Sequence, residues 1–159
     1  MHPVTIGHDV SPRRFAMPST PFLRLSSALT GERRLDEGLS HQFETRITVQ
    51  YGPHLTELLK AFEGRLKSGE PEGAIKDVLE DSKADSTTLD HRHRVARAIV
   101  WAWYTGQFHT PFELPDAPQT PEQYSKGLLW LVIRAHAPAF TDAEYGAWAK
   151  EPPSAKDRD

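Results

Sequence analysis

Apolar residues recur at helical spacing through most of the chain, and the pattern is clearest in residues 53–68. Five large apolar residues there lie at i, i+3, i+4, i+7 and i+11 with charged residues opposite: Leu55, Leu58, Leu59, Phe62 and Leu66. This narrow stripe predicts an amphipathic helix, which Ser68 and Gly69 should end. Pro71 suits the first turn of the next helix, a short one.

The N-terminal part of the chain predicts two further helices. Phe22, Leu25 and Leu29 share one face of a helix that starts at residue 21 and closes at Gly31, because glycine adopts the left-handed conformation easily. Residues 34–50 carry apolar residues every four positions and also favour a helix. The C-terminal part of this segment alternates with β-branched residues, so a strand over residues 45–51 stays open as the alternative.

One long helix is predicted in the middle of the chain, at residues 86–104. Ser86 or Thr87 is expected to cap its N-terminus, and Gly106 to end it. Residues 98–108 of this region read AIVWAWYTGQF and are apolar on every side. A helix that packs on a single core needs only one apolar face, so the second face requires its own explanation.

The last part of the chain begins with a proline-rich stretch, residues 107–119, which is expected to be an extended loop. A capping box between Thr120 and Gln123 then predicts a helix that reaches about His136. A second capping box starts a short last helix at residue 141.

Together these patterns predict an all-α fold, a compact single-domain bundle of six to seven helices. The 159 residues suit one domain with a sizeable core. Residues 1–20 are expected to form an extended N-terminal arm, residues 21–150 the helical domain, and residues 151–159 a frayed polar tail.

Composition and charge exclude several classes of function. The chain has no cysteine, which rules out disulfides, thiolate metal sites and a cysteine nucleophile. Its net charge of −3 gives no reason to expect nucleic-acid binding. The densest apolar runs, residues 98–104 and 127–133, fall well short of the roughly 18 residues that a membrane span needs.

The eight histidines raise the question of a metal site. His91 and His93 are two residues apart, so on a helix their side chains point about 200° apart and cannot share one metal. No two of the remaining histidines have the i, i+4 spacing of a helical metal motif. A stand-alone helical metal-binding protein or enzyme that uses His91, His93 or His136 is kept as the alternative function.

The sequence shows no other arrangement of residues that is typical of a catalytic site. The carboxylate pairs lie in charged contexts, which do not raise a pKa for general acid catalysis. Arg92, Arg94 and Arg97 are expected to form an ion-paired face with neighbouring carboxylates rather than a phosphate contact. We therefore expect no catalytic, cofactor-binding or metal-binding residues in this chain.

Two predicted helices carry a second apolar stripe. On helix 86–104 the face of Trp103 suffices for the core. On helix 120–136 one stripe includes Leu128 and Leu131, and the other includes Trp130. Each second stripe places an arginine four residues from a tryptophan, where a guanidinium stacks on an indole. Tryptophan, tyrosine and arginine are enriched at binding hot spots. Either both helices are buried on all sides or these residues form a partner interface, predicted as Arg97, Trp101, Tyr104, Trp130, Arg134 and Trp148.

Four short segments follow one another in a characteristic order: FLRLSSALTG at residues 22–31, AIVWAWYTG at 98–106, LVIR at 131–134 and WAKEP at 148–152. In this order they resemble the small subunits of bacterial FAD-dependent sugar and alcohol dehydrogenases, such as the sorbitol, glucose and fructose dehydrogenase complexes.

The resemblance implies a non-catalytic helical subunit that binds a large flavoprotein of the glucose–methanol–choline oxidoreductase type. Such a subunit supports the maturation and stability of the flavoprotein, and often its export. FAD would then belong to that partner, and haem c to a multihaem cytochrome subunit.

Two departures from the family pattern bear on export and on association. Arg13 and Arg14 form a twin arginine, but no apolar signal segment follows. The expected location is the periplasm, together with the partner, and the cytoplasm is the alternative. Ala137 stands where some relatives have a cysteine, so a noncovalent association is expected.

Overall fold

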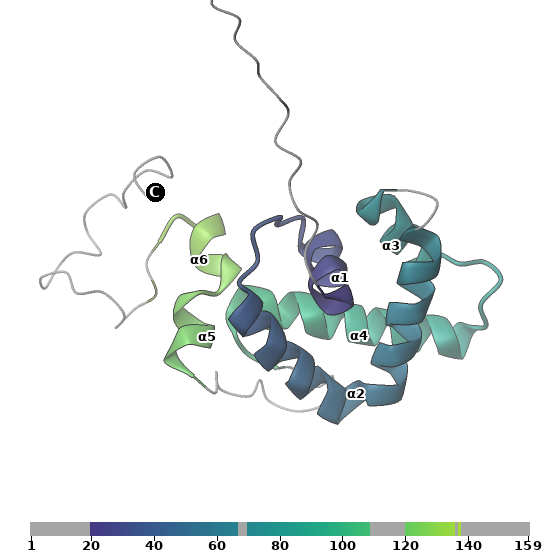
Figure 1. The fold of residues 1–159 in the computed structure, drawn as a ribbon, viewed down its shortest axis with the longest axis horizontal. Coiled ribbons are helices and arrows are strands. Elements are labelled where there is room, and N and C mark those ends of the chain that lie inside the picture. The colour runs from purple at the N-terminus through teal and green to yellow at the C-terminus, as the bar shows by residue number, and fades with distance from the viewer. Residues whose placement is uncertain (1–19, 67–69, 109–119, 136, 138–159) are drawn as a thin grey trace, which may run out of the picture.

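The computed structural model describes residues 20–66, 70–108, 120–135 and 137, and this part of the chain is helical without strands (Figure 1). The all-α prediction is therefore confirmed. The described residues form six helices: α1 (Pro21–Thr30), α2 (Glu37–Leu66), α3 (Pro71–Leu79), α4 (Ser86–Thr105), α5 (Pro121–Ser125) and α6 (Leu128–Val132).

α1 has the ends that its sequence predicts. Thr20 Oγ1 accepts a hydrogen bond from the backbone N–H of Leu23 at 3.1 Å and so caps the N-terminus. Gly31, in the left-handed conformation with a φ of 73°, closes the C-terminus. Phe22 and Leu25 are completely buried, so the predicted apolar face is the one that packs on the core.

α2 is one kinked helix rather than two separate ones. It starts at Glu37, not at residue 34, and the predicted break shrinks to a single residue, Tyr51, with a φ of −128° and a ψ of 16°. Pro53 explains the kink, because its ring cannot donate a hydrogen bond and collides with the preceding turn of a helix. Residues 45–51 are helical, so the strand alternative is wrong.

The core lies where α1, α2, α3 and α4 meet. Phe43 of α2 packs edge-on against Trp103 of α4, with ring centroids 5.0 Å apart. Leu58, Phe62 and Ile99 are completely buried around them. Figure 1 shows α4 running the length of the molecule behind α1 and α2, with α3 near one end and α5 and α6 at the other.

The predicted arginine face of α4 is only partly confirmed. Arg92 is 8% exposed, and its guanidinium binds a Glu57 carboxylate oxygen at 2.7 Å and the Val78 carbonyl at 3.0 Å. Arg94 and Arg97 are exposed, and no carboxylate of the described residues forms an ion pair with them. The N-cap of the helix is Asp85 rather than Ser86 or Thr87.

The prediction of one helix over residues 120–136 is wrong. Lys126 and Gly127 separate α5 from α6, and each of these helices has five residues. Gly127 packs on the end of α4, where an added Cβ would lie 2.8 Å from the carbonyl oxygen of Tyr104. This close backbone contact, which only glycine permits, turns the chain and buries Leu128.

The cap at the start of α5 is as predicted, since Thr120 Oγ1 accepts from the N–H of Gln123 at 3.1 Å. Gln123 is itself 1% exposed and donates from Nε2 to the Gln42 side chain. The predicted N-terminal arm up to residue 19, the loop at 109–119, the helix from residue 141 and the polar tail lie outside the described residues.

Candidate functional site

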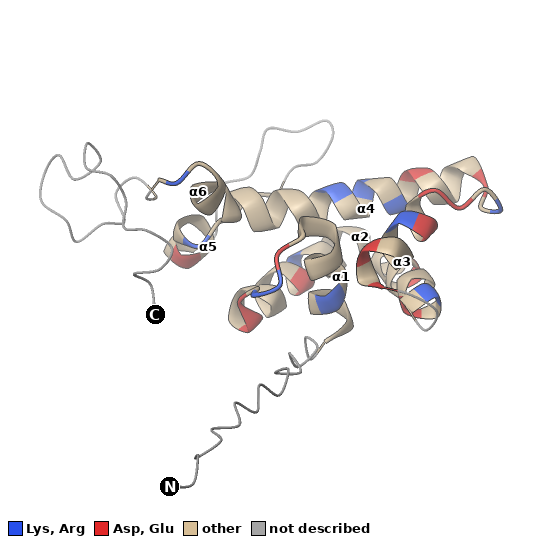
Figure 2. Cartoon of the chain, turned by 90° about the horizontal axis from the view of Figure 1, so that it is seen from above, with Lys and Arg blue, Asp and Glu red and all other residues tan. Residues whose placement is uncertain are grey.

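The end of the molecule formed by α4, α5 and α6 brings together most of the predicted interface residues. α6 contacts α4, and neither α6 nor the part of α4 after Arg97 bears a charged side chain (Figure 2). Charges gather instead on α2, on α3 and on α4 up to Arg97.

Four large apolar residues at this end are exposed, and we call them the α4–α6 apolar surface. Their side chains are 40% exposed at Trp101, 51% at Leu131, 64% at Val132 and 52% at Ile133. Three of them are consecutive. The sequence pattern indicated Trp101 but missed the aliphatic run, because an unbroken helix would have put Leu131 on the same stripe as Leu128.

The structure separates the predicted interface residues into two groups. Arg97 and Trp101 are exposed on α4, and Arg134 is exposed after α6. Tyr104 is half-buried and packs against the core. Trp130 is also half-buried, while Trp148 lies outside the described residues.

Contacts with Tyr124 hold the side chain of Trp130 in place. Its Nε1 donates to the carbonyl of Tyr124 at 2.7 Å, and its ring meets the Tyr124 ring edge-on at 5.3 Å. Much of this side chain therefore stabilises the junction of α5 and α6. Less of it is available for contact with a partner than the sequence predicted.

The predicted stacking of Arg134 on Trp130 along one helix is wrong, because the helix ends before Arg134. Arg134 has a φ of 52°. The N–H of Ala135 donates to the carbonyl of Trp130 at 2.9 Å, and the N–H of Arg134 to that of Leu131 at 3.3 Å. This is a Schellman ending with arginine where glycine is usual, so the sequence carried no visible stop signal.

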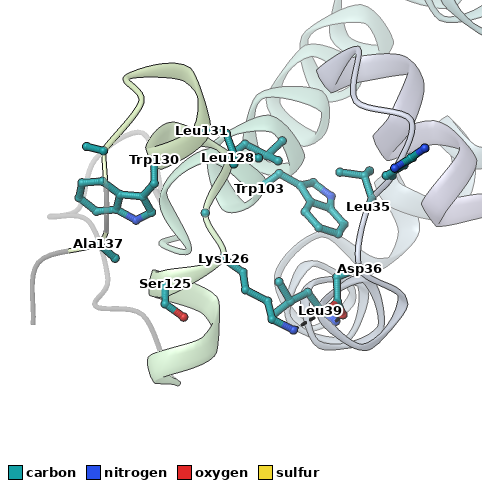
Figure 3. Close-up of a pocket in the computed structure, with 13 residues that line it drawn as sticks. Leu35, Asp36, Leu39, Trp103, Ser125, Lys126, Leu128, Trp130, Leu131 and Ala137 are labelled. Carbon is teal, nitrogen blue, oxygen red and sulfur yellow. Dashed lines mark hydrogen bonds and ion pairs between the residues drawn. The ribbon is translucent and has the colours of Figure 1, made fainter. Parts of the chain in front are cut away.

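A pocket of about 370 Å³ adjoins the α4–α6 apolar surface (Figure 3). It lies between the start of α2, the end of α4 and the α5–α6 junction. Leu39, Trp103 and Leu128 form a buried apolar floor, whereas Arg34 and Lys126 contribute charged groups to the lining. Leu131 belongs both to this lining and to the α4–α6 apolar surface.

Lys126 ties the pocket rim to α2. Its Nζ donates to Asp36 Oδ2 at 2.8 Å and to Glu122 Oε1 at 2.6 Å. The hydrogen bond from Lys126, followed by one from the Leu39 backbone, holds the pKa of Asp36 below its usual value, and the same contact with Asp36 raises the pKa of Lys126. Carboxylates thus neutralise Lys126 on this side of the pocket.

Replacing Asp36 by asparagine should flatten the acid limb of the stability curve. The folded-state pKa of Asp36 is lowered, so its stabilising effect is complete above the unfolded pKa of about 4 and disappears as the pH falls through the lower folded value. Because the side chain is 38% exposed, solvent screening leaves an effect of only about 0.5 kcal/mol. Thermal midpoints of wild type and Asp36→Asn between pH 6 and pH 3 should converge at the acid end, and parallel curves would contradict the assignment.

The histidines do not assemble a metal site within the described residues. His91 stacks on His54 of α2 with ring centroids 3.8 Å apart, whereas His93 Nε2 lies 3.0 Å from the Leu79 carbonyl oxygen. No group of three or more potential ligands occurs in this part of the chain. His136 lies outside it.

Comparison with known proteins gives one family. The model of the family described as membrane-bound FAD-containing D-sorbitol dehydrogenase matches residues 10–152, which is nearly the whole chain. No curated protein matches the chain. Among the described helices none is both long enough and apolar enough to cross a bilayer.

Proposed function

Because the chain belongs to the family of membrane-bound FAD-containing D-sorbitol dehydrogenase, we propose that it is a non-catalytic accessory subunit of such a complex. In this role it binds the FAD-containing catalytic subunit, of the glucose–methanol–choline oxidoreductase type, stabilises it and helps it to mature. FAD belongs to that partner, and haem c to a cytochrome subunit where the complex has one.

The observation that carries this proposal is the α4–α6 apolar surface. Val132 and its two neighbours are more than half exposed, and each would gain about 25 cal/mol for every Å² of apolar area removed from water. Exposed apolar side chains beside a pocket are typical of a site for another protein, and they support the proposal. Trp101 adds an aromatic group of the kind that dominates binding energy at interfaces.

A charge placed on this surface should disrupt the complex without harming the fold. Val132→Asp would bury a carboxylate against apolar atoms of the partner, so we expect affinity for the flavoprotein to fall by about tenfold or more. Val49→Asp is the matched control, because Val49 is 86% exposed on α2. Both variants should keep the thermal midpoint of the free chain.

The measurement is co-expression with the FAD-containing subunit of the complex, purification through a tag on the chain, and titration of the separated subunits. The flavoprotein alone should be less soluble and should contain less flavin. A flavoprotein that is equally soluble, flavin-loaded and active without the chain would refute the accessory role. Equal loss of binding in Val132→Asp and Val49→Asp would refute the assignment of the surface.

The proposed location is the periplasm, reached together with the partner. Fractionation of cells that express both subunits should place the chain with the flavoprotein. If the partner carries the chain across the membrane, expression of the chain without the partner should leave it in the cytoplasm. Periplasmic chain in the absence of the partner would overturn co-export.

A further inference from the structure

In the pocket beside the α4–α6 apolar surface, some hydrogen-bonding groups already have partners within the chain and others do not. Its carboxylate is already used: Asp36 Oδ2 accepts from Lys126 and Oδ1 from the backbone N–H of Leu39 at 2.9 Å. The hydroxyl of Ser125 donates to the Glu122 carbonyl at 3.4 Å. These acceptors and donors of the rim are therefore satisfied within the chain.

Two side-chain hydrogen-bond donors of the pocket lining have no partner among the described residues. Trp103 is 2% exposed, and its buried Nε1 has no hydrogen-bond partner in the part of the chain that the structure describes. In Figure 3 the indole lies between Leu128 and Leu35, with its nitrogen on the side of Leu35. The exposed guanidinium of Arg34 lines the same pocket and forms no ion pair with any described residue.

An unsatisfied buried N–H is costly, and a group that supplies an acceptor removes that cost. A carboxylate is the acceptor that suits both donors, since it binds an arginine and accepts a neutral N–H. The floor of Leu39, Trp103 and Leu128 calls for an apolar group next to that carboxylate. The occupant that fits the pocket therefore combines an apolar side chain with a carboxylate.

The size of the pocket narrows the occupant further. At about 370 Å³ it lies near the lower end of the roughly 300–1,000 Å³ that ligand pockets span. This volume suits one or two amino-acid residues rather than a flavin dinucleotide. Leu131 continues the lining onto the α4–α6 apolar surface, so a chain docked on that surface can reach the pocket directly.

We propose that this pocket anchors a peptide segment of the flavoprotein in which a large apolar side chain adjoins a carboxylate. The apolar side chain rests on the buried floor, and the carboxylate accepts from Arg34 and, after a small shift of the covering side chains, from Trp103 Nε1. The inference rests on the proposed function and adds to it the chemistry of the partner segment.

A pair of neighbouring arginines offers a matched test. Arg34 lines the pocket, whereas Arg33, also exposed, is absent from the lining. Arg34→Gln should weaken binding of the purified flavoprotein by about fivefold to tenfold and reduce its salt dependence, because the ion pair between the exposed guanidinium and the partner's carboxylate is lost. Arg33→Gln should change the affinity by less than about twofold.

Cross-linking identifies the segment. Ala135 is exposed and lines the pocket, so a photoreactive benzoylphenylalanine at this position can report the occupant without disturbing the core. In the complex it should link to one flavoprotein peptide that carries an aspartate or glutamate beside a large apolar residue. The same group at Val49, which is exposed on α2, should not link to that peptide.

NMR can monitor the buried indole N–H of Trp103 directly. N-acetyl-phenylalanine at millimolar concentration should shift the ¹⁵N-indole signal of Trp103 in the free chain, whereas N-acetyl-phenylalanine amide should not. Arg34→Gln should abolish the shift.

The possible results distinguish a failure of the proposed function from a failure of the pocket proposal. Wild-type chain that fails to bind the flavoprotein refutes the proposed function itself. An intact complex with equal affinities of Arg34→Gln and Arg33→Gln refutes the pocket proposal alone. So does a cross-link from position 135 to a second copy of this chain, or a response of Trp103 to N-acetyl-phenylalanine without any effect of Arg34→Gln on the complex.

Discussion

Gly106→Ala is expected to destabilise the fold by about 2–5 kcal/mol, because two separate costs meet at this position. Gly106 caps α4 with a φ of 69°, in the left-handed region that L-residues avoid. An added Cβ would lie 2.4 Å from the carbonyl oxygen of Gln123 and 2.7 Å from its carbonyl carbon. Both atoms are backbone, so α5 would have to move.

Gly31→Ala separates these two costs. Gly31 caps α1 with a φ of 73°, and nothing lies within 4 Å of the position that its Cβ would take. Alanine there should cost only the backbone strain, about 1–2 kcal/mol. Urea unfolding of both variants measures the difference, which is the free energy of the close contact between the end of α4 and α5. Equal losses in the two variants would mean that α5 does not pack on Gly106 in solution.

The contact at Gly106 also bears on the proposed partner. α5 and α6 follow each other with only Lys126 and Gly127 between them, so displacement of α5 shifts α6 and the apolar residues on it. Gly106→Ala should therefore weaken the complex with the flavoprotein more than Gly31→Ala does.

Three helix ends with a local signature were predicted correctly from the sequence: Thr120 caps α5 through the backbone N–H three residues on, and Gly31 and Gly106 end α1 and α4 in the left-handed conformation. Each of these features involves only residues within one turn of the helix end, which is the range over which sequence patterns are informative. The cap of α4 was assigned to Ser86 or Thr87 and is Asp85.

The break between α5 and α6 was not predictable, because its causes are distant in sequence. Gly127 sits within a continuous helical pattern of apolar residues, and only its packing on Tyr104 makes it a turn. Arg134 ends α6 in a conformation for which glycine is the usual signal. The consequence was a wrong assignment of faces: Leu131 is exposed, and Trp130 turns toward Tyr124.

The doubled apolar face of α4 was interpreted correctly in its main feature. Trp103 faces the core and Trp101 faces outward, at exposed fractions of 2% and 40%. Successive tryptophans two positions apart on a helix point in nearly opposite directions, so the periodicity alone assigns one to each face. Tyr104 was harder to assign, because it lies at the boundary and packs partly on the core.

Trp103→Ala is expected to lower the free energy of unfolding by about 3–5 kcal/mol, the range for deleting a fully buried large aromatic side chain. The indole contacts Phe43 edge-on at 5.0 Å and forms part of the pocket floor. Its removal would leave a cavity between α2 and α4, two helices in extensive contact, and their backbone cannot close that cavity without shifting α6 as well.

Trp101→Ala, two residues away on the same helix, is the matched comparison. Its side chain keeps 40% of its area in water, and alanine is the better helix former, so the loss of contacts is partly offset and we expect a change below about 1 kcal/mol. Thermal and urea unfolding of the free chain test both values. The order should reverse for the partner: Trp101→Ala should weaken binding of the flavoprotein while the fold persists. A loss of stability at Trp101 as large as that at Trp103 would make both tryptophans core residues, and the interface would then have to lie elsewhere.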